Sequence, residues 1–373
     1  MSSVCRRLQN IFSTHTTATS SVLSTRELKL QKMADKFKKS SESPKFRFCH
    51  ERYSNIVRRL AAAHKFSLVE DVLEYQKKFE DIRNEQFTIR LITLYGKAGM
   101  FDHAHELFDQ MPDLNCVRTV RSFNALLSAC IGAGKFDKVQ SILQDLPPKL
   151  GVTLDVVSFN TVIKAYCKMG NLDSAVLVLD EMQSKGVEPD LITFNTLLNV
   201  FYGNGKFADG ERIWGLMESK NVVPNTRSYN SRLRGLVLNS RVKEAVKLLG
   251  EMEGKGCKPD VMSYNAVIKG FCDDGNAEEV KRWYKELRDK NCLPDRVTYV
   301  TIVPFLCQKG DFEMALELCT EVINTGLIVG AGLFKPVIDG LVKQSKIEEA
   351  KNLVELGKSN KHCHYKLRLP LDK

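Results

Sequence analysis

The chain of 373 residues lacks the features that mark a membrane protein, a zinc module or a hydrolase. No stretch approaches 18 consecutive apolar residues, so the sequence predicts no membrane-spanning helix and no membrane partner. None of its 11 cysteines belongs to a Cys-x-x-Cys pair, a spacing that many zinc modules use. We also find no Ser-His-Asp, Cys-His or paired-carboxylate arrangement. The sequence therefore predicts a protein that is not an enzyme and has no metal, cofactor or small-molecule substrate.

Acidic residues are missing from the start of the chain, where the first one is Glu27. The same stretch contains Arg6, Arg7 and seven Ser or Thr residues between positions 13 and 21. A basic, hydroxyl-rich and acid-poor start is typical of an organellar transit peptide. We expect residues 1–35 to direct import into the mitochondrial matrix and residues 36–49 to form a basic linker. A disordered tail with no targeting role is the alternative.

The excess of positive charge lies at the two ends of the chain. The formal net charge is +10, which would suit a nucleic-acid-binding protein. However, the first 48 residues hold ten basic and three acidic residues, and residues 359–373 hold four basic and one acidic. The remaining 310 residues are neutral, with 41 of each sign. The sequence thus predicts a neutral body and a basic C-terminal tail over residues 359–373.

The body of the chain repeats one pattern of 35 residues. Four copies run from position 156 to position 295 without insertion, each with Phe-Asn or Tyr-Asn near its start and a closing Pro-Asp or Pro-Asn. Looser copies extend the pattern in both directions. A fixed period of this length indicates stacked helix pairs, because each unit buries its apolar face only against its neighbours. The units begin near residues 50, 85, 120, 156, 191, 226, 261, 296 and 331.

Each unit contains two apolar stripes with helical spacing. In the unit that begins at Val156, the first stripe includes Phe159 and Ile163, and the second includes Leu172 and Leu179. A glycine between the stripes suits the left-handed turn that ends a helix. Cysteine recurs at one position of the first helix, as expected of a small buried side chain (Cys167, Cys272, Cys307). We therefore predict an all-α fold without disulfides, and the adjacent ligand types at residues 362–364 cannot easily converge on one ion.

These features resemble the P-class pentatricopeptide repeat (PPR) proteins of plant mitochondria. The resemblance rests on the period, the Phe/Tyr-Asn pair, the closing Pro-Asp or Pro-Asn, and methionine late in the second helix (Met111, Met182, Met217, Met252). The tetratricopeptide repeat, with a period of 34 and a different Trp-Leu-Gly pattern, does not fit. The resemblance implies a right-handed α-solenoid of about nine helix-turn-helix repeats over residues 50–358, without a catalytic extension.

The resemblance also implies which residues contact RNA bases. In the family, the residue after the Phe or Tyr of the first helix and the residue that closes the unit read one base together. The corresponding pairs here are Asn124 with Asp155, Asn160 with Asp190, Asn195 with Asn225, Asn230 with Asp260, and Asn265 with Asp295. By the family pattern these pairs imply a single-stranded tract near UUYUU. The flanking units depart from the pattern and offer no recognisable reader pair (Ser54, Ile89 with Thr119, Val300 with Gly330, Lys335).

Candidate contacts to the RNA backbone are fewer. Family members carry lysine near the end of the first helix, and only some units of this chain do. The predicted backbone-binding residues are Lys97, Lys168, Arg227, Arg234 and Lys343. Further cations stand in the same helices and could assist (Arg121, Lys164, Arg232, Lys269). Ordinary solvated surface positions are the alternative for each of them.

Two functions remain open at this point. The chain could be a stable associate of the small subunit of the mitochondrial ribosome, with ribosomal RNA and small-subunit proteins as partners. It could instead be a transcript-specific factor for messenger RNA processing, stability or translation. The short array and neutral body favour the first, as does a similarity to short PPR proteins associated with that subunit, carried by the stretches RSFNALLSAC, GERIWGLM and RSYNSRLRGL.

Overall fold

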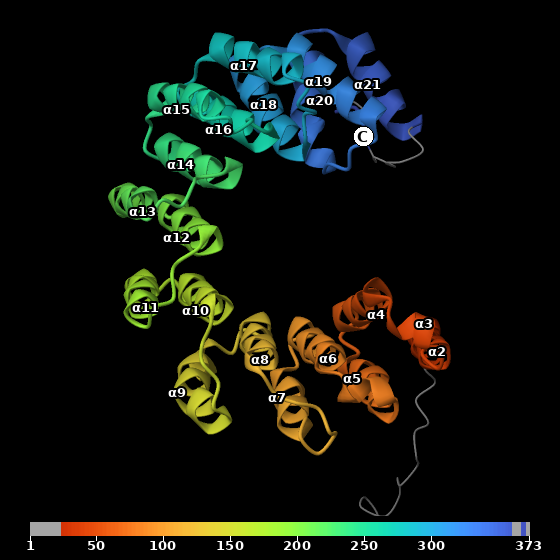
Figure 1. Ribbon diagram of the computed structural model, residues 1–373. Helices are drawn as coiled ribbons and strands as arrows, with labels where there is room; N and C mark the ends of the chain where they lie inside the picture. The colour runs from red at the N-terminus through yellow and green to blue at the C-terminus, as the bar shows by residue number, and fades with distance from the viewer. Residues whose placement is uncertain (1–23, 360–366, 371–373) are drawn as a thin grey trace, which may run out of the picture. The chain divides into compact units, whose positions relative to one another are not determined.

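The computed structural model describes residues 24–359 and 367–370 and divides into two compact units, Met1–Leu154 and Asp155–Lys373 (Figure 1). Within the described residues all regular structure is helical, so the all-α prediction is confirmed. None of these helices is long and apolar enough to cross a membrane. The boundary between the units directly follows the stretch LPPKLGVTL, which makes the repeat that begins at Val120 one residue longer than the others.

The first unit contains three helix pairs preceded by two further helices. Its elements are α2 (Thr25–Ser40), α3 (Pro44–Arg47), α4 (His50–Ala62), α5 (Phe66–Glu74), η1 (Tyr75–Lys78), η2 (Glu80–Arg83), α6 (Glu85–Lys97), α7 (Phe101–Gln110), α8 (Val120–Gly132), η3 (Phe136–Lys138) and α9 (Val139–Leu150). The first helices of the three pairs, α4, α6 and α8, pack side by side, and each contacts its own second helix.

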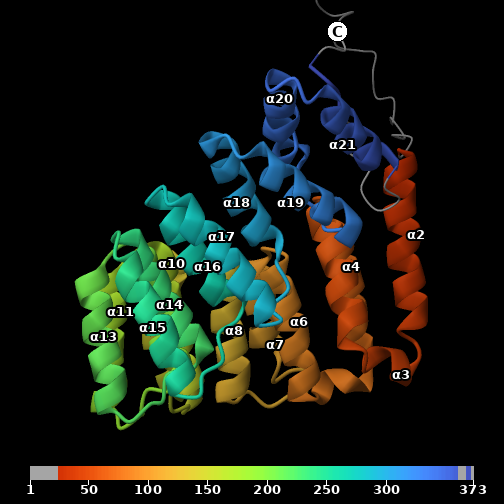
Figure 2. The ribbon, with the colours of Figure 1, turned by 90° about the horizontal axis from the view of Figure 1, so that it is seen from above.

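The second unit contains six helix pairs in unbroken register. Its elements are α10 (Val156–Met169), α11 (Leu172–Ser184), α12 (Leu191–Gly203), α13 (Phe207–Ser219), α14 (Thr226–Leu238), α15 (Val242–Gly254), α16 (Val261–Asp273), α17 (Ala277–Asp289), α18 (Arg296–Lys309), α19 (Phe312–Thr325), η4 (Ala331–Leu333), α20 (Lys335–Lys343) and α21 (Ile347–Ser359). Consecutive first helices, from α10 to α20, pack against one another and form one row (Figures 1 and 2). This arrangement is a helical solenoid.

Small side chains allow the two helices of each pair to approach closely. In five of the nine units the same position of the second helix is a fully buried alanine (Ala104, Ala175, Ala245, Ala315, Ala350). One unit has Gly210 at this position, because the ring of Tyr202 occupies the space where a Cβ would stand, 2.5 Å from its nearest atom. The same ring lies 2.4 Å from the position of a Cβ on Gly235 in the next first helix. The Tyr202 hydroxyl donates a hydrogen bond to Glu211.

We expect Gly235→Ala to lower the free energy of unfolding by about 2 kcal/mol. The new methyl group would overlap carbon atoms of the Tyr202 side chain, and the well-packed core has no room for it. Gly215→Ala is the matched control on an exposed helix position with nothing within 4 Å, and it should stabilise by up to about 1 kcal/mol. Urea denaturation followed by circular dichroism measures both. Equal stabilisation by the two substitutions would contradict the packing described here.

Residues 36–49 are not the linker expected from their composition. They form the end of α2 and all of α3, and α2 packs against α4 and α5. The ring of Phe37 is buried and lies edge-on to Tyr53, with 4.9 Å between the ring centroids. The helix begins with a capping box in which Ser24 and Glu27 bond each other's backbone N–H groups. Helical structure is therefore already present at Thr25, inside the range expected for the transit peptide.

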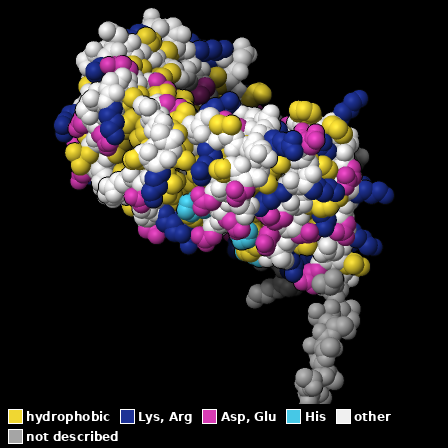
Figure 3. Space-filling model, turned by 60° about the horizontal axis from the view of Figure 1, so that its bottom comes forward, with side chains coloured by type: hydrophobic (Ala, Val, Ile, Leu, Met, Phe, Trp, Pro, Cys, Tyr) yellow, Lys and Arg dark blue, Asp and Glu magenta, His cyan; other side chains and the backbone are white. Residues whose placement is uncertain are grey.

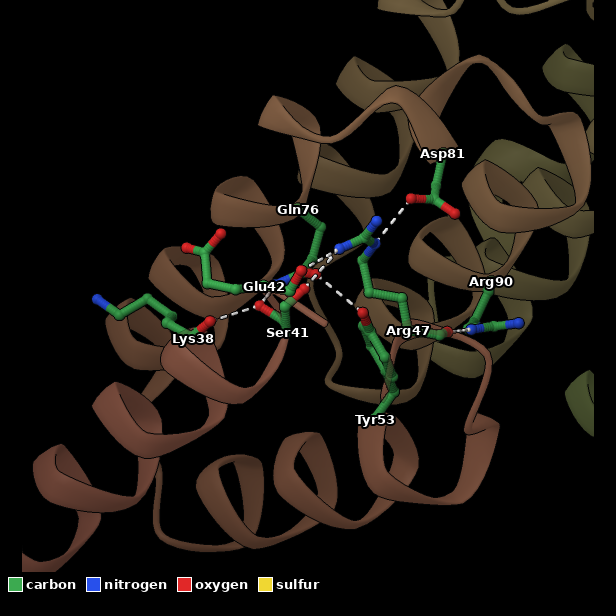
Figure 4. Close-up of polar contacts among 8 residues, drawn as sticks. All are labelled: Lys38, Ser41, Glu42, Arg47, Tyr53, Gln76, Asp81 and Arg90. Atoms are coloured by element: carbon green, nitrogen blue, oxygen red, sulfur yellow. Dashed lines mark hydrogen bonds and ion pairs between the residues drawn. The ribbon is translucent and has the colours of Figure 1, made fainter. Parts of the chain in front are cut away.

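Arg47 holds this N-terminal segment to the rest of the first unit (Figure 4). Its side chain is buried and forms an ion pair with Asp81, with 2.7 Å between Nε and Oδ2. Its Nη1 donates to the carbonyl oxygens of Ser41 and Glu42 at 2.8 and 3.0 Å. The guanidinium also lies 4.2 Å from the ring centroid of Phe79. One side chain thus fixes the turn after α2 against η2.

A second group of polar contacts joins the same segments. The Tyr53 hydroxyl donates to Oε1 of Gln76 at 2.8 Å, and Nε2 of Gln76 donates to the Ser41 hydroxyl at 3.3 Å (Figure 4). Ser41 and Gln76 are fully buried, and in this position each has a hydrogen-bond partner. The basic residues of this segment are also engaged, since Lys38 pairs with Asp71. The segment is a folded cap on the first helix pair.

Candidate RNA-binding surface

The asparagine and the closing aspartate of each predicted reader pair lie in direct contact. Asp190 is the N-cap of α12, and its Oδ1 accepts a hydrogen bond from the Thr193 backbone N–H at 2.8 Å. The side-chain amide of Asn160, on α10, donates to the same oxygen at 3.0 Å. The Thr193 hydroxyl in turn donates to Oδ1 of Asn160 at 2.5 Å. The three side chains therefore form a closed ring that links two consecutive first helices.

This ring recurs at each later reader pair of the second unit. The asparagine amide donates to the closing residue in Asn195–Asn225 (3.3 Å), Asn230–Asp260 (3.0 Å) and Asn265–Asp295 (3.0 Å). The third member donates its hydroxyl to the asparagine oxygen: Ser228 at 2.6 Å, Ser263 at 2.6 Å and Thr298 at 2.8 Å. These bonds leave one amide hydrogen of each asparagine and Oδ2 of each aspartate for other partners.

The hydroxyl residues of these rings were missed by the sequence reasoning. Each stands three positions after the closing residue and is fully buried (Thr193, Ser228, Ser263, Thr298). The signal was present, because Asp or Asn followed three residues later by Ser or Thr, just before an apolar stripe, is a helix-start pattern. The closing residue thus has a structural duty as an N-cap in addition to its predicted contact with RNA.

The remaining predicted pair spans the two units. Asn124 is buried on α8 of the first unit, and Asp155 caps α10 at the start of the second. Their joint role in base reading stays a prediction. Thr119 closes the unit of Ile89, which has no recognisable reader pair. It caps α8 and donates its hydroxyl to Glu85 at 2.7 Å. Val300 lies 41% exposed in the register of the asparagines.

The five predicted backbone-binding residues are all exposed (Lys97, Lys168, Arg227, Arg234, Lys343). Lys97, Lys168 and Lys343 stand in the last turn of a first helix, where a cation also stabilises the helix dipole. The Arg234 guanidinium reaches the C-terminal end of α12, 3.2 Å from where a Cβ of Gly203 would stand. In the part of the chain that the structure describes, none of the five forms an ion pair. Their charges are free to meet phosphate.

Three of the four additional cations considered from the sequence are engaged, while Lys164 is exposed and forms no ion pair among the described residues. Arg232 makes two hydrogen bonds to the carboxylate of Glu211, at 2.8 and 2.6 Å, and covers the Trp214 ring at 4.7 Å from its centroid. Lys269 pairs with Asp273 one helical turn later, and Arg121 donates to Gln86. The expectation that these residues compensate for missing lysines is wrong for Arg232, whose charge serves a contact between α13 and α14.

A row of exposed apolar residues accompanies the reader pairs in the second unit. The second residue of the first helix is Val157, Ile192, Met262 or Val297, each between 52% and 63% exposed, and Arg227 takes this position in the remaining unit. Nothing in the helix pair requires an apolar side chain in water at the same position of four units. The repetition therefore indicates a surface that contacts a partner.

Charge is mixed on the face of the molecule drawn in Figure 3. Basic and acidic side chains are interspersed there, in agreement with the neutral body expected from the sequence. Because the body has no excess of positive charge, binding to a polyanion would depend on cations that are not paired with carboxylates.

Comparison with known proteins accounts for this geometry. The model of the PPR repeat family matches residues 154–202, 189–238, 228–273 and 259–308, and the PPR repeat model matches residues 90–116 and 121–147. Together these matches cover more than half of the chain. The chain belongs to the pentatricopeptide repeat family.

Relatives of this PPR protein are known from Arabidopsis thaliana. The small ribosomal subunit protein mS79 is 47% identical over 156 residues, which are 42% of this chain and 40% of mS79. A mitochondrial pentatricopeptide repeat-containing protein is 40% identical over 137 residues, 37% of this chain and 34% of the relative. The matches thus span less than half of either relative. The crystal structure of maize PPR10 is similar in fold, with a TM-score of 0.53 and 22% identity, covering 97% of this chain and 49% of that one.

The thiols of the PPR helices are protonated, buried groups. Burial raises the pKa of Cys167 and Cys307 to about 11 and that of Cys272 to about 12. All cysteines of the described residues are free. Within those residues no group of three or more His, Cys, Asp or Glu could hold a metal ion. Residues 362–364, which combine histidine and cysteine, lie outside the described residues.

The pKa of Asp190 is lowered in the folded protein. Burial acts to raise this pKa, but the hydrogen bonds from the Thr193 N–H and the Asn160 amide outweigh it. The carboxylate is therefore ionised at neutral pH and holds its two donors. Because the folded-state pKa lies below the unfolded one, the contribution of Asp190 to stability is present above the ordinary carboxyl range and is lost as the pH falls through the lowered value.

We expect Asp190→Ala to lower the free energy of unfolding by about 1 kcal/mol at neutral pH, since α12 loses its N-cap and Asn160 loses its acceptor. Asp190→Asn is the matched control, because Asn225 performs the same capping in the next unit. Asp190→Asn should lower the free energy of unfolding by less than Asp190→Ala. It should also remove the part of the acid sensitivity that comes from Asp190. Chemical denaturation at neutral and acidic pH measures both. An equal loss in the two variants would show that the cap is not the relevant interaction.

Proposed function

We propose that this chain is a non-catalytic RNA-binding PPR protein of mitochondrial gene expression and a stable associate of the small subunit of the mitochondrial ribosome. RNA binding is supported mainly by the ring of three side chains that repeats four times in register in the second unit. Its members are an asparagine, a closing Asp or Asn, and a Ser or Thr. Because each ring fixes the orientation of its asparagine amide, the side chains are ordered before RNA arrives and lose little entropy on binding.

The free groups of these rings suit pyrimidines. An Asn with Asp leaves one amide N–H and one carboxylate oxygen, a donor and an acceptor that complement the carbonyl and the N–H of a uracil edge. Asn195 with Asn225 can offer a second amide donor in place of the carboxylate. The exposed aliphatic row beside them offers apolar contact to base faces, and Arg227 can stack on a base. We propose a preference for a single-stranded tract near UUYUU.

Association with the ribosomal small subunit is supported by the similarity to mS79, whose name places that relative in a small ribosomal subunit. The similarity covers 42% of this chain, so the assembly of the whole protein is part of the proposal. The basic N-terminal segment supports this association less than its composition implied, because two of its cations, Lys38 and Arg47, are engaged within the first unit. The unpaired cations of the first helices are instead the groups that would meet the phosphates of ribosomal RNA.

The test is a sucrose gradient of solubilised mitochondria probed for this protein, with and without magnesium chelation. We expect co-migration with small-subunit proteins that survives moderate salt and follows the dissociated subunit when magnesium is removed. Migration in light fractions that shift only after RNase treatment would overturn the ribosomal proposal. That outcome would favour the second candidate, a transcript-specific factor, which the four consecutive reader rings also support.

Import into the mitochondrial matrix is part of the same proposal, and its sequence determinants lie in residues 1–23, outside the described residues. Because Ser24 caps α2 and α2 packs into the first unit, we expect the mature protein to begin at or before Ser24. A fluorescent reporter fused to residues 1–40 should reach mitochondria, and Arg6→Gln with Arg7→Gln should leave it in the cytosol. Processing inside α2, or a reporter confined to plastids, would contradict this prediction.

A further inference from the structure

The last repeat lacks a reader pair and carries two lysines on its first helix. Lys335 stands in the register of the reading asparagines, five periods after Asn160, and Lys343 stands in the register of Lys168. Both lysines are exposed, and neither forms an ion pair within residues 24–359 and 367–370. Their helix, α20, packs against α18 and so continues the row of first helices. This unit cannot read a base as the others do, because it has neither the asparagine nor a closing aspartate.

The C-terminal segment of the chain returns to this helix. Residues 367–370 lie against α20, and together they line a half-open pocket of about 680 Å³, a size typical of ligand pockets. Leu367 is only 4% exposed, which anchors the segment. The cavity is lined by Lys335 and Lys343 from the helix and by Arg368 from the segment, with Asp339 as its one acidic group. Three cations thus face a single carboxylate.

We propose that this pocket binds a phosphate group of the RNA strand at the C-terminal end of the row of first helices. The proposal rests on the proposed RNA-binding function and adds a site that grips the backbone without reading sequence. An arginine fork and lysine ammonium groups are the side chains best suited to phosphate oxygens. The position follows from the register, since a strand that passes the reader pairs of α10 to α16 and continues past α18 would meet α20 in the same row. Arg368 completes the site from a segment outside the repeats.

The experiment measures binding of a fluorescent U-rich oligoribonucleotide to the full chain by anisotropy over a series of salt concentrations. We expect Lys335→Gln combined with Arg368→Gln to weaken binding roughly tenfold. The slope of log K against log salt should fall by about 0.7, because the pocket neutralises one phosphate and each neutralised phosphate accounts for about 0.7. The weakening should be equal for U-rich and A-rich strands. Lys358→Gln, an exposed cation on α21 outside the pocket, is the control and should change neither quantity.

A third variant decides whether the segment belongs to the site or merely covers the helix. Leu367→Asp should release the segment, and we expect it to weaken RNA binding as Arg368→Gln does while the thermal unfolding of the helices is retained. An increase in affinity would overturn the proposal, because the segment would then be a cover over α20. So would a double variant that behaves like the Lys358 control.

Two further outcomes separate the sources of failure. If inorganic phosphate at concentrations near those in cells displaces the RNA from the wild type but not from the double variant, the pocket is a free-phosphate site and the assignment to RNA is wrong. If the wild type binds no RNA of any sequence, the proposed function fails together with this site. Binding by the wild type with no effect of the pocket variants overturns the site alone.

Discussion

Replacing Lys168, Arg227 and Arg234 together with glutamine is expected to weaken binding of single-stranded RNA about tenfold and to reduce its salt dependence by about 2 in log–log slope. All three side chains are exposed, belong to first helices of the second unit and have no ion pair among the described residues. The body of the chain is neutral, so few cations are available to release counterions from RNA. Removing any one of them therefore takes away a large share of the electrostatic attraction.

The matched control removes the same amount of charge from the second-helix side. Lys185, Arg282 and Lys290 are exposed but pair with Glu181, Glu279 and Glu253. Their replacement with glutamine should leave RNA binding nearly unchanged. Fluorescence anisotropy with U-rich and A-rich strands measures both triple variants. If the two triple variants weaken RNA binding equally, only net charge matters. If the wild type binds the U-rich and the A-rich strand equally, the asparagine rings do not select bases.

The same design avoids a weakness of replacing the reading asparagines themselves. Asn195 and Asn265 are buried, and their oxygens accept from Ser228 and Thr298. Alanine at these positions would remove the side-chain hydrogen bonds that join consecutive first helices, which destabilises the helix packing. A decrease of RNA binding in such variants would mix base recognition with stability. The exposed cations carry no comparable structural duty.

Arg47→Ala is expected to lower the free energy of unfolding of the first unit by about 3 kcal/mol. The substitution leaves the Asp81 carboxylate, which is 23% exposed, without its partner. It also removes the donor from the Ser41 and Glu42 carbonyl groups and the cation from the Phe79 ring. Because these interactions hold the turn after α2, the cap over α4 and α5 should detach. Limited proteolysis should then cut within residues 24–49.

The control for this prediction is Lys38→Ala. Lys38 lies in the same segment as Arg47 and pairs with Asp71, but the side chains of Lys38 and Asp71 are 20% and 44% exposed. A partly exposed ion pair contributes less than about 1 kcal/mol. Thermal and urea denaturation measure both variants on the full chain. If the two substitutions cost the same, Arg47 is an ordinary surface ion pair and residues 24–49 are not a cap.

The repeat and the placement of its helices could be predicted from the sequence alone. A period of 35 residues with two apolar stripes leaves few ways to bury the apolar faces, so stacked helix pairs follow. The same period put Asn160 and Asp190 in registers that the structure shows in contact at 3.0 Å. Local patterns of this kind survive in sequence because the residues that interact are one repeat apart and the interaction recurs. Even the missed hydroxyl partner, Thr193, was visible as a helix-start pattern.

Which charges are free, and where the folded part begins, became known only from the packing of the helices. Arg47 and Arg232 look like solvated cations in the sequence, yet carboxylates on other helices engage them (Asp81, Glu211). Residues 36–49 have a linker's composition but fold, because α2 buries Phe37 against Tyr53. Arg368 lies beside Lys335 only because Leu367 is buried close to α20. Each of these interactions occurs once and outside the period, so no repetition in the sequence could reveal it.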